Sequence, residues 1–160
     1  MTDFTTADLY DAFPDLATPL CLPFRSYGKT QKFFGQIRTV RCPNDNSMVR
    51  KTLQTNGSNQ VLVIDAASSR EFAFLGDQLA KLALTNRWSG IVVNGCVRDS
   101  AILETLDIGI FALGTCPRKT SKNNLGEIDV NLIIDKIQVL PKHYLYADSD
   151  GVILSSKALI

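Results

Sequence analysis

The sequence predicts a mixed α/β fold in which a parallel core of buried strands carries additional antiparallel strands. Three short β-branched runs, at residues 60–65, 90–95 and 108–113, have the pattern of strands that are covered on both faces. Helical patterns separate these runs, so the three strands are expected to pair in parallel through right-handed crossovers. At 160 residues the chain has the usual length of one domain, and residues 1–160 are expected to form a single compact domain.

One helix and one strand are expected near the beginning of the chain. Thr5 or Thr6 can cap a helix that runs through Phe13, because Pro14 follows it. Residues 15–32 contain prolines and a glycine and are expected to be irregular. Residues 33–42 alternate between apolar and polar side chains, which predicts a half-exposed strand.

The core strands are expected to be joined by two helices. Asp45 or Asn46 could cap a helix that runs through Asn56, with the glycine at position 57 ending it. Residues 66–71 are expected to connect the first core strand to a central helix. That helix begins near Leu75, since apolar residues recur at helical spacing from there.

The last third of the chain reads as a short helix, a long loop and several short strands. The helix covers residues 100–106, and the loop of residues 114–129 is long enough to suggest either a functional role or a solvated surface segment. A sequence typical of a hairpin turn precedes Gly151. The expected strands flank these turns, at residues 130–134, 136–140, 144–147 and 151–154.

Composition narrows the classes of function. The chain has 17 Lys and Arg against 16 Asp and Glu, and without a basic stripe nucleic acid is not expected as a direct partner. Four scattered cysteines and a single histidine do not form the spacing of a zinc site or a dense disulfide scaffold. The acidic N-terminal segment does not resemble a signal peptide, and no apolar run approaches about 18 residues. We therefore expect a cytoplasmic protein without a membrane partner.

Polar residues at two places suggest a binding site. Gly76 and Asp77 stand at the start of the central helix, where the first backbone N–H groups can receive an anion. Arg98 and Asp99 follow a buried strand, and ligands bind at the carboxyl ends of strands in open α/β sheets. Together they suit a small, doubly anionic substrate held with a hard metal ion. An unliganded helix start and a surface ion pair would give the same pattern.

Asp77 and Arg98 are separated by twenty residues, 78–97, and Asp99 follows directly. This Asp-x20-Arg-Asp pattern, within Gly-Asp-Gln-Leu and Asn-Gly-Cys-Val-Arg-Asp, resembles the signature of the 4-hydroxy-4-methyl-2-oxoglutarate aldolases of the RraA-like family. Further blocks are similar to the family in the same order and cover nearly the whole chain. They lie at residues 34–42, 61–65, 106–111 and 145–155.

The resemblance implies a swivelling ββα-type domain that assembles as a homotrimeric ring, with active sites near the subunit interfaces. It also implies a divalent metal, Mg²⁺ or Mn²⁺, and a 2-keto dicarboxylate substrate. The expected reaction cleaves 4-hydroxy-4-methyl-2-oxoglutarate into two molecules of pyruvate, often with oxaloacetate decarboxylation as a side activity. Both reactions pass through a pyruvate enolate.

The resemblance also implies a role for each residue of the motif. Asp99 is expected to bind the metal, directly or through water. Arg98 is expected to bind the substrate carboxylate and keto oxygen and to stabilise the enolate charge, while Asp77 orients or deprotonates a metal-bound water. A substrate carboxylate is expected at the backbone amides of the helix start, those of Gly76, Asp77, Gln78 and Leu79.

Other functions remain open. The same family includes the regulator of ribonuclease E, which binds and masks that enzyme, although the complete motif here favours catalysis. Lys81 could serve as the nucleophile of a lysine-type aldolase, or it could be a solvated helix lysine. His143 could carry a phosphoryl group, as swivelling domains elsewhere do, or it could be structural.

The chain departs from the family pattern at two places. A glycine-rich turn commonly follows the first core strand in the family, whereas this chain has Ala66 and Ala67. The family's Pro-Gly-Asp before the last strands is replaced by Pro-Lys-His at residues 141–143. Neither change touches the motif, but both are expected to alter loops near the site or the contact between subunits.

Overall fold

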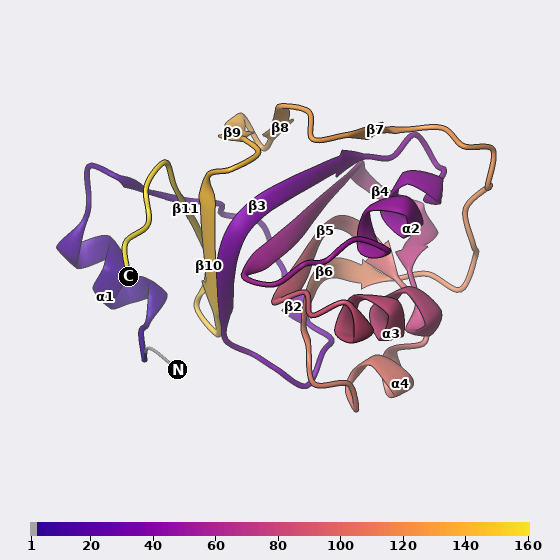
Figure 1. Ribbon diagram of the computed structural model, residues 1–160, viewed down its shortest axis with the longest axis horizontal. Helices are drawn as coiled ribbons and strands as arrows, with labels where there is room; N and C mark the ends of the chain where they lie inside the picture. Colours follow the sequence, from indigo (N-terminus) through magenta and orange to yellow (C-terminus); the bar gives the residue numbers. More distant parts are fainter. Residues whose placement is uncertain (1–2) are drawn as a thin grey trace.

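The computed structural model describes residues 3–160 and is built around one mixed sheet (Figure 1). Four neighbouring strands pair in parallel: β3 (Phe33–Arg41), β4 (Gln60–Leu75), β5 (Gly90–Val97) and β6 (Gly109–Thr115). The order of strands across the sheet is β1 (Ala17–Pro19), β11 (Gly151–Ser155), β10 (Tyr144–Asp148), β3, β4, β5, β6 and β2 (Arg25–Ser26), with β7 (Glu127–Ile128) beside β3. The predicted parallel core is therefore confirmed.

Antiparallel strands extend this core on both sides. β10 (Tyr144–Asp148) and β11 (Gly151–Ser155) form the predicted hairpin, and β10 pairs with β3. The prediction that residues 15–32 are irregular was wrong in part, because β1 (Ala17–Pro19) pairs with β11 and β2 (Arg25–Ser26) pairs with β6. These strands form the two edges of the sheet, where a proline is tolerated.

Three helices cover one face of the parallel strands, and the fourth lies at the other end of the molecule (Figure 1). The first group contains α2 (Ser47–Leu53), α3 (Asp77–Thr85) and α4 (Ser100–Leu103), and the separate helix is α1 (Thr6–Ala12). Thr5 caps α1, as predicted. The helices α2 and α4 end three residues before the predicted positions, because the chain continues in tighter i to i−3 turns, for example from the N–H of Leu106 to the carbonyl of Leu103.

The predicted connection at residues 66–71 was also wrong, since this segment belongs to β4. The register between β4 and β5 shifts after Asp65, again after Ser69, and once more before the end of the strand. Ala67 and Ser68 have φ values of 51° and 59°, so the strand bulges at this point and then continues to Leu75. The central helix α3 consequently begins at Asp77.

Side chains alternate between two apolar clusters on the faces of the sheet. The cluster beneath α2, α3 and α4 includes Leu62, Ile64, Ile91, Val93 and Ile110. On the opposite face, Val61, Val63, Val92 and Phe111 pack with the small hairpin of β8 (Leu132–Ile134) and β9 (Ile137–Val139). A third cluster fastens α1 to β10 and β11. Among residues 3–160, no helix has the length and apolar character needed to cross a membrane.

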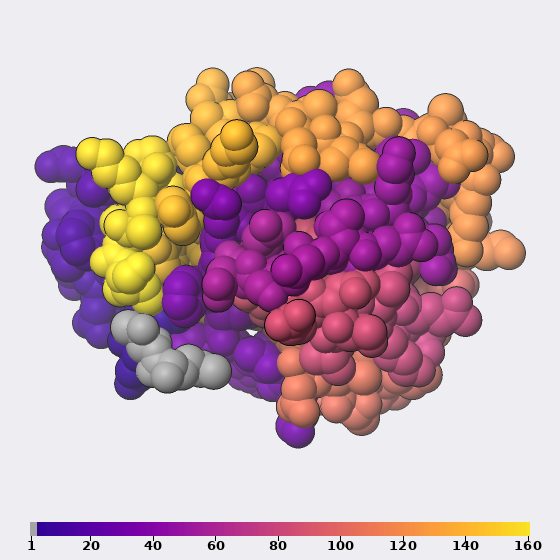
Figure 2. All heavy atoms as spheres, viewed as in Figure 1, coloured from indigo at the N-terminus to yellow at the C-terminus, as the bar shows by residue number. Residues whose placement is uncertain are grey.

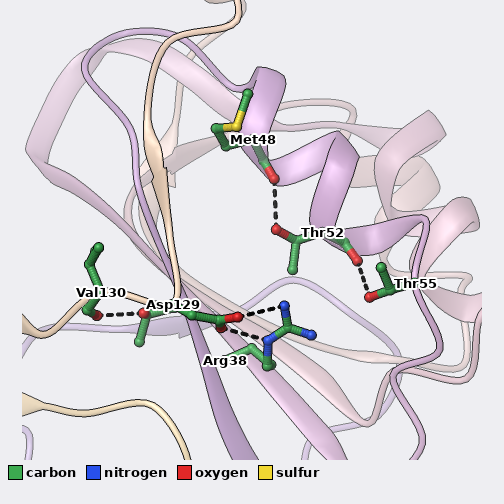
Figure 3. A network of polar contacts seen from close by, with 7 residues as sticks. Arg38, Met48, Thr52, Thr55, Asp129 and Val130 are labelled. Atoms are coloured by element: carbon green, nitrogen blue, oxygen red, sulfur yellow. Dashed lines mark hydrogen bonds and ion pairs between the residues drawn. The ribbon is translucent and has the colours of Figure 1, made fainter.

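The long loop after β6 is tied to the sheet where it returns. Arg38 on β3 forms two contacts with the Asp129 carboxylate, at 2.6 and 2.8 Å, and the Thr39 hydroxyl donates to the carbonyl of Val130 at 2.6 Å (Figure 3). The hydroxyl of Thr52 on α2 and that of Thr55, just after α2, donate to the carbonyls of Met48 and Thr52, which both lie within the helix (Figure 3). The loop, in orange, follows the upper and right-hand rim of the molecule in Figure 2.

Candidate active site

All six predicted site residues line one cavity of about 230 Å³. The cavity lies at the carboxyl ends of the parallel strands, because the last residues of β4, β5 and β6 (Leu75, Val97 and Thr115) lie side by side in register. Its walls come from α2, the start of α3, the residues after β5 and the long loop. They are Asn46, Arg50, Ala73, Gly76, Asp77, Gln78, Leu79, Arg98, Asp99, Lys119 and Lys122.

Asp99 joins the two halves of the motif. Its Oδ2 accepts a hydrogen bond from the backbone N–H of Asp77 at 3.1 Å and lies 3.9 Å from Nε of Arg98. Asp99 has a φ of 59°, a left-handed conformation that Asp adopts more readily than most residues. This conformation directs the chain into α4 immediately after the strand.

Position 76 has room only for glycine, because the side chains of Arg98 and Asp99 lie close to its backbone. A Cβ atom at this position would lie 2.7 Å from Oδ2 of Asp99 and 3.2 Å from Cγ of Arg98. The Gly76 backbone is extended, with φ at −133°, so its conformation alone does not demand glycine. The motif therefore includes glycine because the cavity wall leaves no room for a side chain.

Asp77 forms an ion pair one helical turn along α3, with its Oδ2 2.9 Å from Nζ of Lys81. The hydrogen bond from Lys81 is the largest of the effects that hold the pKa of the Asp77 carboxyl below its ordinary value. Lys81 has a side chain that is 54% exposed, whereas the amine nucleophiles of aldolases are desolvated or placed beside another cation. Lys81 is therefore an ion-pair partner of Asp77 rather than a nucleophile.

The backbone amides at the start of α3 are partly engaged within the protein. The N–H of Asp77 donates to Asp99, and the N–H of Gln78 contributes to lowering the pKa of the Asp77 carboxyl. A substrate carboxylate at this helix start would have to share or replace these contacts. Binding of substrate by the amides of Gly76, Asp77, Gln78 and Leu79 stays a prediction.

Five residues that line the cavity were not predicted as site residues: Ala73 and four residues with polar side chains. Lys119 and Lys122 belong to the long loop, whose length was the available signal. Asn46 was considered only as a helix cap, yet its Nδ2 donates to the carbonyl of Phe74 at 3.2 Å. Arg50 lies on α2 in an ordinary helical pattern, and no motif points to it.

The loop that carries the two lysines is held by a buried carboxylate. Asp45, with 0% exposure, accepts hydrogen bonds from the backbone N–H groups of Ser47 at 2.8 Å and Asn123 at 2.5 Å. Burial alone would raise the pKa of Asp45, but the Ser47 hydroxyl and the backbone N–H groups, including those of Asn123 and Ser47, outweigh it and lower the pKa. The N–H of Ala73 adds a bond to the carbonyl of Arg118 at 2.7 Å. The cavity wall is therefore fixed at both α2 and β4.

The donor set of the cavity suits a hard divalent cation. Asp77 and Asp99 bring two carboxylates to the same cavity, and their side chains lie close enough for Asp99 to affect the pKa of Asp77. Residues 3–160 contain no cluster of three or more His, Cys, Asp or Glu side chains, the kind of set that holds zinc. Magnesium, in contrast, is commonly held by one or two carboxylates and several waters. Asp99, with Asp77 nearby, fits that pattern.

A family model described as RraA-like, aldolase/RraA, matches residues 6–154. The chain belongs to the RraA-like family. A relative from Vibrio parahaemolyticus, named "Putative 4-hydroxy-4-methyl-2-oxoglutarate aldolase", is 48% identical over 154 residues, which cover 96% of each chain.

Two solved structures match this chain in fold. The RNA-processing inhibitor RraA from Thermus thermophilis is 40% identical, with a TM-score of 0.94 over 98% of this chain and 94% of its own. A protein from Geobacillus kaustophilus, described as S-adenosylmethionine: 2-dimethylmenaquinone methyltransferase, is 43% identical, with a TM-score of 0.95 over 98% and 97%. The three names differ, so membership of the RraA-like family does not fix the activity, which must be argued from the site.

Proposed function

We propose that this chain is a divalent-metal-dependent lyase, a class II-type aldolase that cleaves 4-hydroxy-4-methyl-2-oxoglutarate into two molecules of pyruvate. Oxaloacetate decarboxylation is the side activity expected of the same site. The observation that carries the proposal is the meeting of Asp77, Arg98 and Asp99 at one cavity, with Asp77 and Asp99 joined by a hydrogen bond of 3.1 Å. The name of the Vibrio relative supports the same reaction.

Cleavage requires the substrate to be held by its 2-keto acid end. The C4 hydroxyl loses its proton, the C3–C4 bond breaks, and the electron pair of that bond moves toward the C2 keto oxygen. C3 then takes up a proton, which gives the second pyruvate. In oxaloacetate the C3–C4 bond releases carbon dioxide instead, and charge develops on the same oxygen. With both substrates, the site therefore has to stabilise a negative charge that develops on the C2 oxygen.

The residues of the cavity divide this work. The Arg98 guanidinium binds the C1 carboxylate and the C2 oxygen and stabilises the charge that develops there. Asp77, kept ionised by Lys81, accepts the proton of the C4 hydroxyl through a water molecule. Asp99 would hold the cation, Mg²⁺ or Mn²⁺, through its carboxylate. When bound, the cation supplies Lewis acidity toward the keto oxygen.

Pyruvate release from 4-hydroxy-4-methyl-2-oxoglutarate and from oxaloacetate, with magnesium or with EDTA, tests the proposal. Metal-only decarboxylation of oxaloacetate is subtracted. We expect metal-dependent turnover that falls about 10²- to 10³-fold in Arg98→Ala and in Asp99→Ala. Asp107→Ala is the matched control, because this carboxylate pairs with Lys29 at the surface and does not line the cavity. Turnover that never exceeds the metal-only blank, in folded protein, would contradict the proposal.

The alternative is a non-catalytic regulator that binds and inhibits ribonuclease E. It is favoured by the 40% identity to the RNA-processing inhibitor from Thermus thermophilis. This function predicts direct binding to the ribonuclease, and binding that survives in Arg98→Ala. Measuring ribonuclease binding and pyruvate release on the same protein samples separates the two functions.

The proposed assembly is a homotrimeric ring of swivelling ββα-type domains in the cytoplasm, with no nucleic acid or membrane partner. Light scattering coupled to size exclusion tests the ring, since a trimer of this 17.6 kDa chain has three times that mass. A phosphoryl carrier role is not proposed for His143, which lies in a separate cavity beside Lys136 and Leu154.

A further inference from the structure

The cavity that contains Asp77, Arg98 and Asp99, called the active cavity below, has more cationic side chains than are needed to bind a single carboxylate. Its lining includes four cationic side chains, Arg50, Arg98, Lys119 and Lys122, against two carboxylates, Asp77 and Asp99. Asp77 is already paired with Lys81, and Asp99 lies beside Arg98. The cations contributed by α2 and the long loop are therefore the ones left for the far end of a ligand.

Arg50 stands where this cavity meets a second one. Asn46, Arg50 and Gln54 are spaced four residues apart and lie on one face of α2 and its end. A neighbouring cavity of about 360 Å³ shares Asn46, Arg50 and Lys122 with the active cavity and continues to Gln54. Within residues 3–160, Arg50 is exposed and forms no ion pair, so its guanidinium is available to a ligand.

We propose that Arg50 is a specificity-determining residue that binds the second carboxylate of the 2-keto dicarboxylate substrate. This inference rests on the proposed function. Arg98 follows β5 and holds the 2-keto acid end, while Arg50 reaches the same cavity from α2. A guanidinium binds a carboxylate through two parallel hydrogen bonds, which fixes the position of the group as well as its charge. Lys119 and Lys122 add positive potential without that directional preference.

Binding of two probes tests the assignment without requiring turnover. Pyruvate presents the 2-keto acid end alone, and 2-oxoglutarate adds a second carboxylate at the position that it has in 4-hydroxy-4-methyl-2-oxoglutarate. Dissociation constants are measured by isothermal titration in the presence of magnesium. For Arg50→Gln we expect about 10- to 100-fold weaker binding of 2-oxoglutarate, the range of a hydrogen bond to a charged group. Pyruvate binding should change less than about twofold, because the lost group lies at the other end.

Lys51→Gln is the matched control. It removes the same charge from the next residue of α2, and Lys51 lines the second cavity but not the active one. Binding of both probes should be retained in this variant, and Arg50→Lys should restore only part of the affinity for 2-oxoglutarate. Thermal unfolding shows whether each variant is folded.

Two patterns would overturn the assignment. Equal weakening of the binding of both probes in Arg50→Gln would mean that Arg50 acts only through the positive electrostatic potential of the cavity. Unchanged affinity for 2-oxoglutarate in this variant, or no binding of 2-oxoglutarate by the wild type, would mean that Arg50 does not bind the second carboxylate. The lyase proposal is decided separately. A wild type that discriminates the probes through Arg50 but releases no pyruvate would sustain the subsite and contradict the reaction.

Discussion

At the scale of single residues, the cavity wall is most sensitive where the motif is most crowded. Gly76 has an extended backbone, yet a Cβ there would lie 2.7 Å from the Asp99 carboxylate. We expect Gly76→Ala to move Asp99 and Arg98 and to lower kcat/KM for pyruvate release by at least about tenfold, because misplacement on the ångström scale is costly in catalysis. The free energy of unfolding should change by less than about 1 kcal/mol, because the local backbone is not strained. Unchanged kinetics in this variant would mean that Asp99 has room to adjust.

Two residues at the places where the chain departs from the family pattern lower the stability of the fold through backbone strain. Ala67 has a φ of 51°, and Lys142, where the family has glycine, has a φ of 70°. Side chains are disfavoured in this left-handed region, so Ala67→Gly and Lys142→Gly should each stabilise the protein by about 0.5–1 kcal/mol in urea unfolding. Ala66→Gly is the control, since Ala66 is a buried strand residue outside the left-handed region. This control should lose stability, and a gain in it would show that backbone strain is not the cause.

The sequence predicted the motif residues because each has a local reason to stand where it does. Asp77 follows a glycine at a helix start, and Arg98 and Asp99 follow a buried strand, so their positions marked them as candidates. The resemblance to the RraA-like family then favoured a site over a helix start and a surface ion pair. No local sequence feature of this kind pointed to Arg50. Its place in the cavity depends on how α2 lies against the long loop, and this arrangement comes from tertiary contacts rather than from a local pattern.

At the scale of elements, Asp45 holds in place the part of the cavity wall that the long loop forms. This buried carboxylate accepts two backbone N–H groups, one from Ser47 and one from Asn123. Asp45→Ala should cost about 2–4 kcal/mol of unfolding free energy, because two partly buried donors lose a charged acceptor that is itself buried. Faster hydrogen exchange confined to residues 119–124 is also expected. Asp107→Ala serves as the exposed control, and equal exchange in both variants would mean that Asp45 does not hold the loop.

Some strands of the sheet could be predicted from local sequence patterns, and others could not. The core strands could be predicted because their β-branched runs are covered on both faces. The extension of β4 through residues 66–75 could not, because small and polar residues break the alternation and the strand is defined by its pairing with β5. The edge strands β1 and β2 have three and two residues, and such short segments form only where a neighbouring strand supplies hydrogen bonds.

At the scale of the whole molecule, one buried carboxylate joins the two ends of the chain. Asp148 on β10 accepts the N–H and the hydroxyl of Thr6, both at 2.7 Å, and the N–H of Asp150 at 3.0 Å. Burial alone would raise the pKa of Asp148, but these hydrogen bonds outweigh it and lower the pKa. A carboxyl whose pKa is lowered on folding stabilises the fold above its unfolded-state pKa, and this stability is lost as the pH falls through the folded-state value.

Asp148→Asn should therefore lose about 2 kcal/mol of unfolding free energy at pH 7, because hydrogen bonds to a charged group are replaced by weaker ones. The difference between the wild type and the variant should shrink as the pH falls below about 4, near the ordinary value of 3.8 from which the pKa of Asp148 is lowered. Urea unfolding at several pH values measures it. Asp150→Asn is the control, because only the backbone of Asp150 takes part. A difference that stayed constant with pH would show that the charge of Asp148 is not the source of the stability.

The contact between Thr6 and Asp148 spans 142 residues of sequence. Leu9 of α1 packs in one apolar cluster with Tyr146, Ile153 and Leu159, all of which are synthesised much later than α1. The apolar side of α1 therefore stays uncovered until β10 and β11 have left the ribosome. A ribosome that stalls before β10 would release a product in which α1 cannot dock, and its exposed apolar side would be open to chaperones and proteases.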